Sequence, residues 1–96
     1  MNKPISRQEE SLLPSFSSHE EARNYFTNLY GTDFILESAD YIGDQICYFY
    51  ALIINRGEYE RGQELLMSGT SVSGFDFLYS YQSIQIMDNG SVHIVH

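Results

Sequence analysis

The stretch Ile46-Cys47-Tyr48-Phe49-Tyr50-Ala51-Leu52-Ile53-Ile54 decides the fold of this 96-residue chain. It carries no charge and is rich in β-branched and aromatic side chains, a composition typical of a strand with little water on either face. The rest of the chain must supply the neighbours that cover it. A chain of 96 residues is long enough for one domain with one modest core.

The segment before this stretch predicts a β-hairpin. A two-residue turn at 43–44 pairs Tyr41 with Ile46 and Glu37 with Tyr50. Because paired residues point to the same face, one face of the hairpin receives the apolar side chains and the other receives the tyrosines together with Glu37. A slip of one residue in the pairing would exchange the two faces.

A helix is predicted over about 18–30. Ser18 and Glu21 have the spacing of a capping box at its start, and Gly31 is typical of the residue that follows a helix end. Apolar residues recur between these signals at helical spacing, so we expect one side of this helix to face the sheet.

A second helix is predicted over about 56–67, with Asn55 as its N-cap and Glu58 three residues later. Gly62 disfavours a helix interior by about 1 kcal/mol relative to alanine. Residues 58–61 also alternate in the manner of a strand, so a third strand over 58–67 is the alternative.

The end of the chain predicts another hairpin. Asp88-Asn89-Gly90-Ser91 contains a type I′ turn signal between an extended segment over 75–87 and a last strand over 91–96. A two-residue turn would pair Met87 with Val92. Polar residues interrupt the alternation, so a bulge is expected near 81–83, and residues 68–74 are predicted to be a loop.

These elements predict an α+β fold: a small single domain with an antiparallel sheet of about four strands in two hairpins, packed by an N-terminal helix and a second helix at about 56–67. Polar residues and prolines predict that 1–16 form a flexible N-terminal arm, which leaves 17–96 as the domain. The expected core combines the helix stripe with the apolar hairpin face: Ala22, Phe26, Leu29, Phe34, Leu36, Phe49, Ala51 and Ile53.

The formal net charge of −8 at pH 7 limits the partners. An acidic domain repels phosphates, so direct nucleic-acid binding is not expected. The charge favours either simple solubility or a basic protein partner. The apolar stretch is too short to cross a bilayer and the first residues lack a signal-peptide pattern, so we expect a cytoplasmic protein without membrane association.

Motifs for catalysis or metal binding are absent from the sequence. His93 and His96 would lie on opposite faces of a strand, which prevents a simple shared metal site. Cys47 is the only cysteine, so an intramolecular disulfide is excluded. The sequence contains neither a Gly-x-Ser-x-Gly frame nor a phosphate-binding glycine loop. The chain is therefore expected not to be an enzyme and to need no cofactor or metal.

The expected function is that of a small acidic, non-catalytic protein-interaction domain: an inhibitor, an antitoxin-like protein or a regulatory partner of a basic protein. A homodimer is left open, and the alternative is a small-ligand binding domain with a tyrosine-lined cleft. Tyrosine is favoured at protein interfaces. The candidate partner-binding residues are Glu37, Tyr41, Tyr48, Tyr50, Tyr79 and Tyr81.

Overall fold

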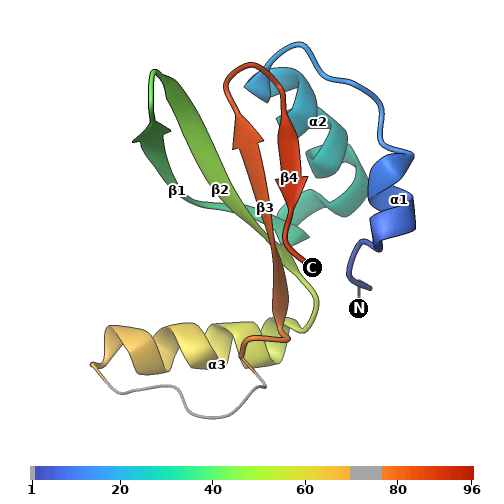
Figure 1. Ribbon diagram of the computed structural model, residues 1–96. Helices are drawn as coiled ribbons and strands as arrows, with labels where there is room; N and C mark the ends of the chain where they lie inside the picture. The colour runs from blue at the N-terminus through green and yellow to red at the C-terminus, as the bar shows by residue number, and fades with distance from the viewer. Residues whose placement is uncertain (1, 70–76) are drawn as a thin grey trace.

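A computed structural model of the chain describes residues 2–69 and 77–96. Its elements are α1 (Arg7–Ser11), α2 (His19–Tyr30), the 3-10 turn η1 (Gly31–Asp33), β1 (Phe34–Ile42), β2 (Gln45–Ile53), α3 (Arg56–Met67), β3 (Tyr81–Met87) and β4 (Val92–Ile94). The described strands form one antiparallel sheet in the order β1-β2-β3-β4 (Figure 1). The predicted α+β class is confirmed, and residues 58–67 are helical rather than extended.

Both long helices begin where their capping signals place them. The Ser18 hydroxyl accepts a hydrogen bond from the Glu21 amide at 3.2 Å, and the Asn55 side chain accepts one from the Glu58 amide at 3.2 Å. These bonds satisfy amide groups that a helix start otherwise leaves without partners. α2 ends at Tyr30 and is followed by Gly31, whose φ of 58° lies in the left-handed region that favours glycine.

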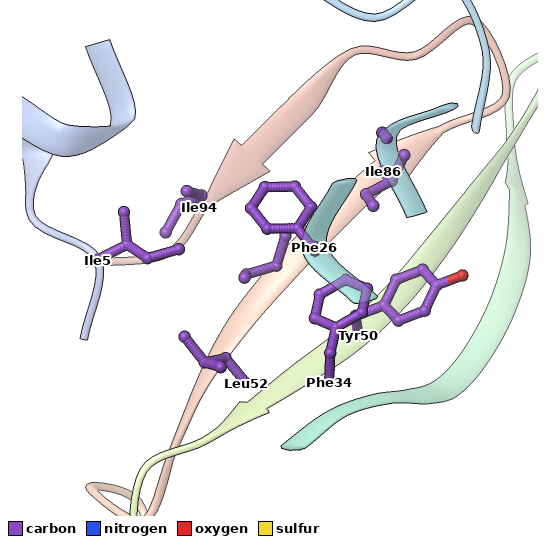
Figure 2. Packing of buried hydrophobic residues seen from close by; sticks show 9 residues of the cluster. Ile5, Phe26, Phe34, Tyr50, Leu52, Ile86 and Ile94 are labelled. Atoms are coloured by element: carbon purple, nitrogen blue, oxygen red, sulfur yellow. The ribbon is translucent and has the colours of Figure 1, made fainter. Parts of the chain in front are cut away.

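The face of the sheet that packs against α2 is the tyrosine face of the first hairpin, so the predicted assignment of the two faces is wrong. Figure 2 shows Phe26 of α2 lying over Phe34, Tyr50 and Leu52 from β1 and β2. The rings of Phe34 and Tyr50 stack with centroids 4.4 Å apart. The core cluster consists of Ile5, Ala22, Phe26, Phe34, Tyr50, Leu52, Ile84, Ile86 and Ile94.

A bulge in β1 explains the exchange of faces. Tyr41 pairs with Ile46 as predicted, but the register shifts between Leu36 and Ser38, so Leu36 pairs with Tyr50 in place of Glu37. The extra residue shifts the pairing of the preceding residues of β1 by one position. Their side chains therefore point to the face opposite to the predicted one. Phe34 therefore joins the Tyr50 face and enters the core.

The predicted core is confirmed only in part. Three of its members lie in the cluster beneath α2: Ala22, Phe26 and Phe34. Three others belong to strand positions on the opposite face: Phe49, Ala51 and Ile53. There Ala51 and Ile53 form a smaller cluster with Tyr59 of α3. Leu29 and Leu36 are 57% and 51% exposed and contribute little to either cluster.

Gly62 is unfavourable for a helix by propensity, but it is needed for packing. A Cβ atom at this position would overlap the ring of Phe77, which therefore packs directly on the backbone of α3. Phe77 and Tyr59 stack with centroids 6.0 Å apart. Phe77 lies in a turn rather than a strand, because the amide of Ser80 donates to its carbonyl at 3.0 Å. β3 consequently begins later than the predicted extended segment.

The β3–β4 hairpin has a three-residue loop, and the predicted register is wrong by one residue. Ile86 pairs with Val92 in place of Met87. The Met87 amide donates to the Ser91 carbonyl at 2.9 Å, and the Gly90 amide donates to the Met87 carbonyl at 3.0 Å. This is a turn followed by a left-handed glycine, with a φ of 92° at Gly90.

β3 pairs with β2 in an unbroken register from Met87 to Tyr81, so the bulge expected near 81–83 is wrong. The expected loop over 68–74 and the start of the extended segment at 75 concern residues 70–76, which lie outside the described residues.

The N-terminal segment is attached to the sheet, in contrast to the expected loose arm. Ile5 is buried in the core. The Gln82 side chain accepts a hydrogen bond from the Ile5 amide at 2.7 Å and donates one to the Ile5 carbonyl at 3.0 Å. The carboxylate of Glu10, at the C-terminal part of α1, accepts a bond from the Ile94 amide at 3.2 Å and lies 2.8 Å from His96 Nε2. Side-chain contacts to the backbone thus fix α1 beside β4.

We predict that Leu52→Ala destabilises the chain by about 2–5 kcal/mol, because Leu52 is fully buried beneath α2 and its loss leaves a cavity. Leu36→Ala is the matched control, since Leu36 is 51% exposed and its loss should cost less than about 1 kcal/mol. Urea unfolding of the two variants tests this prediction. Equal losses would contradict the difference in burial between the two leucines.

We also predict that Gly90→Ala destabilises the chain more than Gly43→Ala does. Both glycines have left-handed φ angles, of 92° and 65°, so each substitution should cost about 1–2 kcal/mol of backbone strain. Only at Gly90 would the new Cβ also overlap the carbonyl of Phe16, in the segment that leads into α2. Thermal unfolding compares the two variants, and identical melting temperatures would show that this close approach is absent.

Candidate functional site

Residues 36–44 form an exposed surface along the outer strand of the sheet, which we call the β1 edge. β1 is at one end of the strand order, and every residue from Leu36 to Ile42 is exposed. β2 has the same length but ends in four buried residues. Figure 1 shows β1 as the outermost strand, with α2 on the β4 side of the view. The first hairpin thus presents one covered strand and one open strand.

The β1 edge is acidic. Glu37, Asp40 and Asp44 lie on it, and the sequence contains neither lysine nor arginine over 24–55. Across residues 2–69 and 77–96, the ion pairs join Arg56 to Asp33 and Glu60, Arg61 to Glu58, and His96 to Glu10. None of the three carboxylates of the β1 edge takes part in these ion pairs.

The β1 edge also exposes large apolar side chains. Tyr41, Ile42 and Leu36 are 73%, 53% and 51% exposed. The strand register places Leu36 and Tyr41 on the α2 side of the sheet and Ile42 on the other. The β1 edge therefore combines carboxylates with exposed aromatic and aliphatic side chains.

The backbone of β1 turns hydrogen-bonding groups outward. Ile46 directs its carbonyl to the Asp88 amide at 3.0 Å and its amide to the Asp88 carboxylate at 3.3 Å, away from β1. Its cross-strand partner Tyr41 therefore directs its own peptide groups away from β2. The same alternation turns the peptide groups of Ala39 outward. The Tyr41 amide donates to the carboxylate of its neighbour Asp40 at 2.8 Å.

Two of the candidate tyrosines lie beneath α2. Tyr50 is only 3% exposed, and its hydroxyl is 2.7 Å from His19 Nε2. Tyr48 is partly buried, and its ring stacks on the His19 ring with centroids 3.6 Å apart. Burial, followed by the nearby charge of Arg23, lowers the pKa of His19. The structure thus places Tyr48 and Tyr50 in contacts within the chain.

Glu37 and Tyr81 lie on the other face, beside α3. The bulge turns Glu37 toward Tyr59, whose hydroxyl donates to its carboxylate at 2.9 Å. Burial, and then this bond, raise the pKa of Tyr59 to about 12. The ring of Tyr81 meets that of Tyr59 edge-on at 5.6 Å, and burial raises the pKa of Tyr81 as well. Glu37 therefore joins the β1 edge to α3.

Tyr79 and Tyr81 line a groove of about 430 Å³ with Leu78, Gln82 and Val95 among its walls. Tyr79 is 74% exposed, whereas Tyr41 lies on the β1 edge. The six candidate residues are therefore divided among the α2 contact, the α3 contact, the groove and the β1 edge. They do not meet on one surface.

Sequence reasoning missed Asp40, Asp44 and the outward-facing backbone of β1. The signal that could have identified the acidic residues is the segment 24–55, which contains acidic residues but neither lysine nor arginine. The structure also shows a solvent-shielded oxygen, Oε1 of Gln45, that accepts no hydrogen bond from the described residues. Gln45 pairs with Ile42 at the end of the same hairpin.

We predict that Tyr59 stabilises the fold below pH 10 and loses this contribution as the pH rises toward 12. A phenol whose pKa is about 12 in the folded chain and 10 in the unfolded chain ionises first in the unfolded state. The free energies of unfolding of wild type and Tyr59→Phe should therefore converge over this range. Urea unfolding between pH 9 and pH 12 measures the difference, and a constant gap would contradict the shift.

Within the described residues, no helix combines the length and the apolar character that crossing a membrane requires, and no group of three or more His, Cys, Asp or Glu side chains could hold a metal ion. Comparisons of the chain with protein-family models, with curated proteins and with solved structures find no significant match.

Proposed function

We propose that this chain is a small non-catalytic interaction domain that binds a basic protein through the β1 edge. The observation that carries the proposal is the combination of unneutralised carboxylates, exposed apolar side chains and outward-facing peptide groups along one strand. Each of these features alone occurs on ordinary protein surfaces. Together they provide the electrostatic, apolar and directional parts of a binding surface.

The charge favours a basic partner. The whole chain has a formal charge of −8, and the carboxylates of Glu37, Asp40 and Asp44 are concentrated on one edge. Such a field speeds the encounter with a cationic surface and disfavours an acidic one. A second copy of this chain would bring the same carboxylates against each other, so the proposal favours a different protein over a homodimer through this edge.

The apolar side chains would supply much of the affinity. Tyr41 is 73% exposed and has the amphipathic character of residues that contribute strongly to interfaces. Ile42 and Leu36 lie on the same strand and are 53% and 51% exposed. A domain of this kind acts by occupying the basic surface of its partner, in the manner of an inhibitor, an antitoxin-like protein or a regulatory subunit.

A second candidate function is the binding of a small ligand. The groove beside Tyr79 and Tyr81 has a volume of about 430 Å³, within the range of small-molecule sites. Its aromatic and aliphatic walls favour a flat, largely apolar molecule. The observation behind this candidate is limited to the groove, whereas the β1 edge combines three independent features, so the protein partner is preferred.

We predict that Asp40→Asn/Asp44→Asn weakens binding to a basic partner roughly tenfold, because two carboxylates of the β1 edge are neutralised. The control is Glu20→Gln/Glu64→Gln, which removes the same charge from exposed positions on α2 and α3. Affinity capture from cells of the source organism, compared by quantitative mass spectrometry across wild type and both variants, identifies the partner. Calorimetry with that purified protein then measures the affinities.

The expected result is a basic protein that wild type and the control retain and the Asp variant releases. Equal binding by the Asp variant, or retention of no basic protein by wild type, would overturn the proposed function.

A further inference from the structure

We propose that the partner binds as an added strand: an extended cationic segment of another protein pairs antiparallel with residues 38–42 of β1. This inference rests on the proposed function and specifies its partner. The segment would extend the sheet by one strand on the open side of β1, with main-chain hydrogen bonds setting its position and side chains setting its identity.

The stretch over 38–42 is the part of β1 that can accept such a strand. It pairs with β2 in unbroken register from Ser38–Phe49 to Ile42–Gln45. The bulge at Glu37 interrupts the edge just before it, and a regular partner strand cannot follow β1 across an extra residue. Tyr41 and Ala39 direct their peptide groups outward, so each can form a hydrogen-bonded pair with one partner residue.

The side chains of this stretch specify an alternating partner. Asp40 shares its face with Cys47, on the α3 side of the sheet, whereas Ala39 and Tyr41 share theirs with Tyr48 and Ile46. A partner residue opposite Asp40 meets a carboxylate and should be lysine or arginine. Those opposite Ala39 and Tyr41 meet an apolar surface and should be apolar. Directly opposed side chains lie close enough for these contacts.

Asp40 protects the edge until such a strand arrives. In the free chain its carboxylate accepts the hydrogen bond of the outward Tyr41 amide at 2.8 Å. This bond occupies a donor that would otherwise invite indiscriminate pairing. A carbonyl of the incoming strand would take over the amide and release the carboxylate for the cation opposite it. A strand without a cation would leave the released charge unpaired, so the exchange favours a basic segment.

The test uses isotope-labelled full-length protein and a nine-residue peptide of alternating lysine and valine, acetylated and amidated at its ends. The pairing scheme places valines opposite Ala39 and Tyr41, so the valine amides face β1 and the lysine amides face away. One derivative carries N-methyl groups on its valines and its matched control carries them on its lysines. A third peptide has glutamate in place of lysine. NMR titration measures each dissociation constant and maps the shifted resonances.

The expected result is binding of the unmethylated peptide with shifts centred on residues 38–42. Methylation of the valines should weaken binding at least tenfold, whereas methylation of the lysines should change it less than threefold. Equal binding of both methylated peptides, or no binding of the unmethylated one, would overturn strand addition and leave the proposed function to its own test. Equal binding of the glutamate peptide would overturn the role of charge, and with it the proposed function.

A substitution in the protein provides an independent measurement. Ala39→Pro removes the outward amide while leaving the pairing of β1 with β2 intact, since that amide faces away from β2. Ala39→Val is the matched control, because it keeps the amide and enlarges the side chain. Ala39→Pro should lose at least tenfold in affinity for the lysine–valine peptide and Ala39→Val should not. Equal affinities would overturn the inference; should Ala39→Pro fail to fold, the methylated peptides decide the question on the unmodified chain.

Discussion

The extra residue in β1 is the constraint on which both layers of this fold depend. Before the bulge, Phe34 points toward α2 and stacks on Tyr50. At the bulge, Glu37 leaves that face and accepts a hydrogen bond from Tyr59 of α3. After it, the side chains of the strand are exposed. The bulge thus determines which side chains of β1 enter the core, which one contacts α3 and which are exposed to solvent.

The sequence could predict the elements of this fold but not the faces they present. Ser18 and Asn55 predicted the helix starts because capping is a local interaction. The bulge at Glu37 has no such local signal, so strict alternation assigned the hairpin faces in reverse. The candidate site suffered from the same error, since Tyr50 fills the core with its ring and satisfies its hydroxyl through His19. The acidic run over 24–55 was visible, but the exposure of its backbone depends on tertiary packing.

The two edge strands of the sheet, β1 and β4, are protected from unspecific strand pairing in different ways. β4 has three residues, and the Glu10 carboxylate covers the amide of Ile94. β1 has nine residues, and its protection consists of the bulge, the charges and the bond from the Tyr41 amide to Asp40. Natural sheets use such devices to prevent unspecific pairing between molecules. In the strand addition that we propose, they would also make the β1 edge selective, because a partner would have to match the charges in order to displace the Asp40 bond.

The hydrogen bonds between Gln82 and Ile5 have a consequence for how the chain folds. They join residues separated by 77 positions, so the N-terminal segment reaches its site only after β3 has been formed. Closing so long a loop is entropically costly before any contact rewards it, and folding rates fall as contacting residues become more distant in sequence. During synthesis on the ribosome, Ile5 can therefore form these hydrogen bonds only after Gln82 has emerged. We therefore expect docking of α1 to be a late step of folding, which completes a core formed by the sheet and α2.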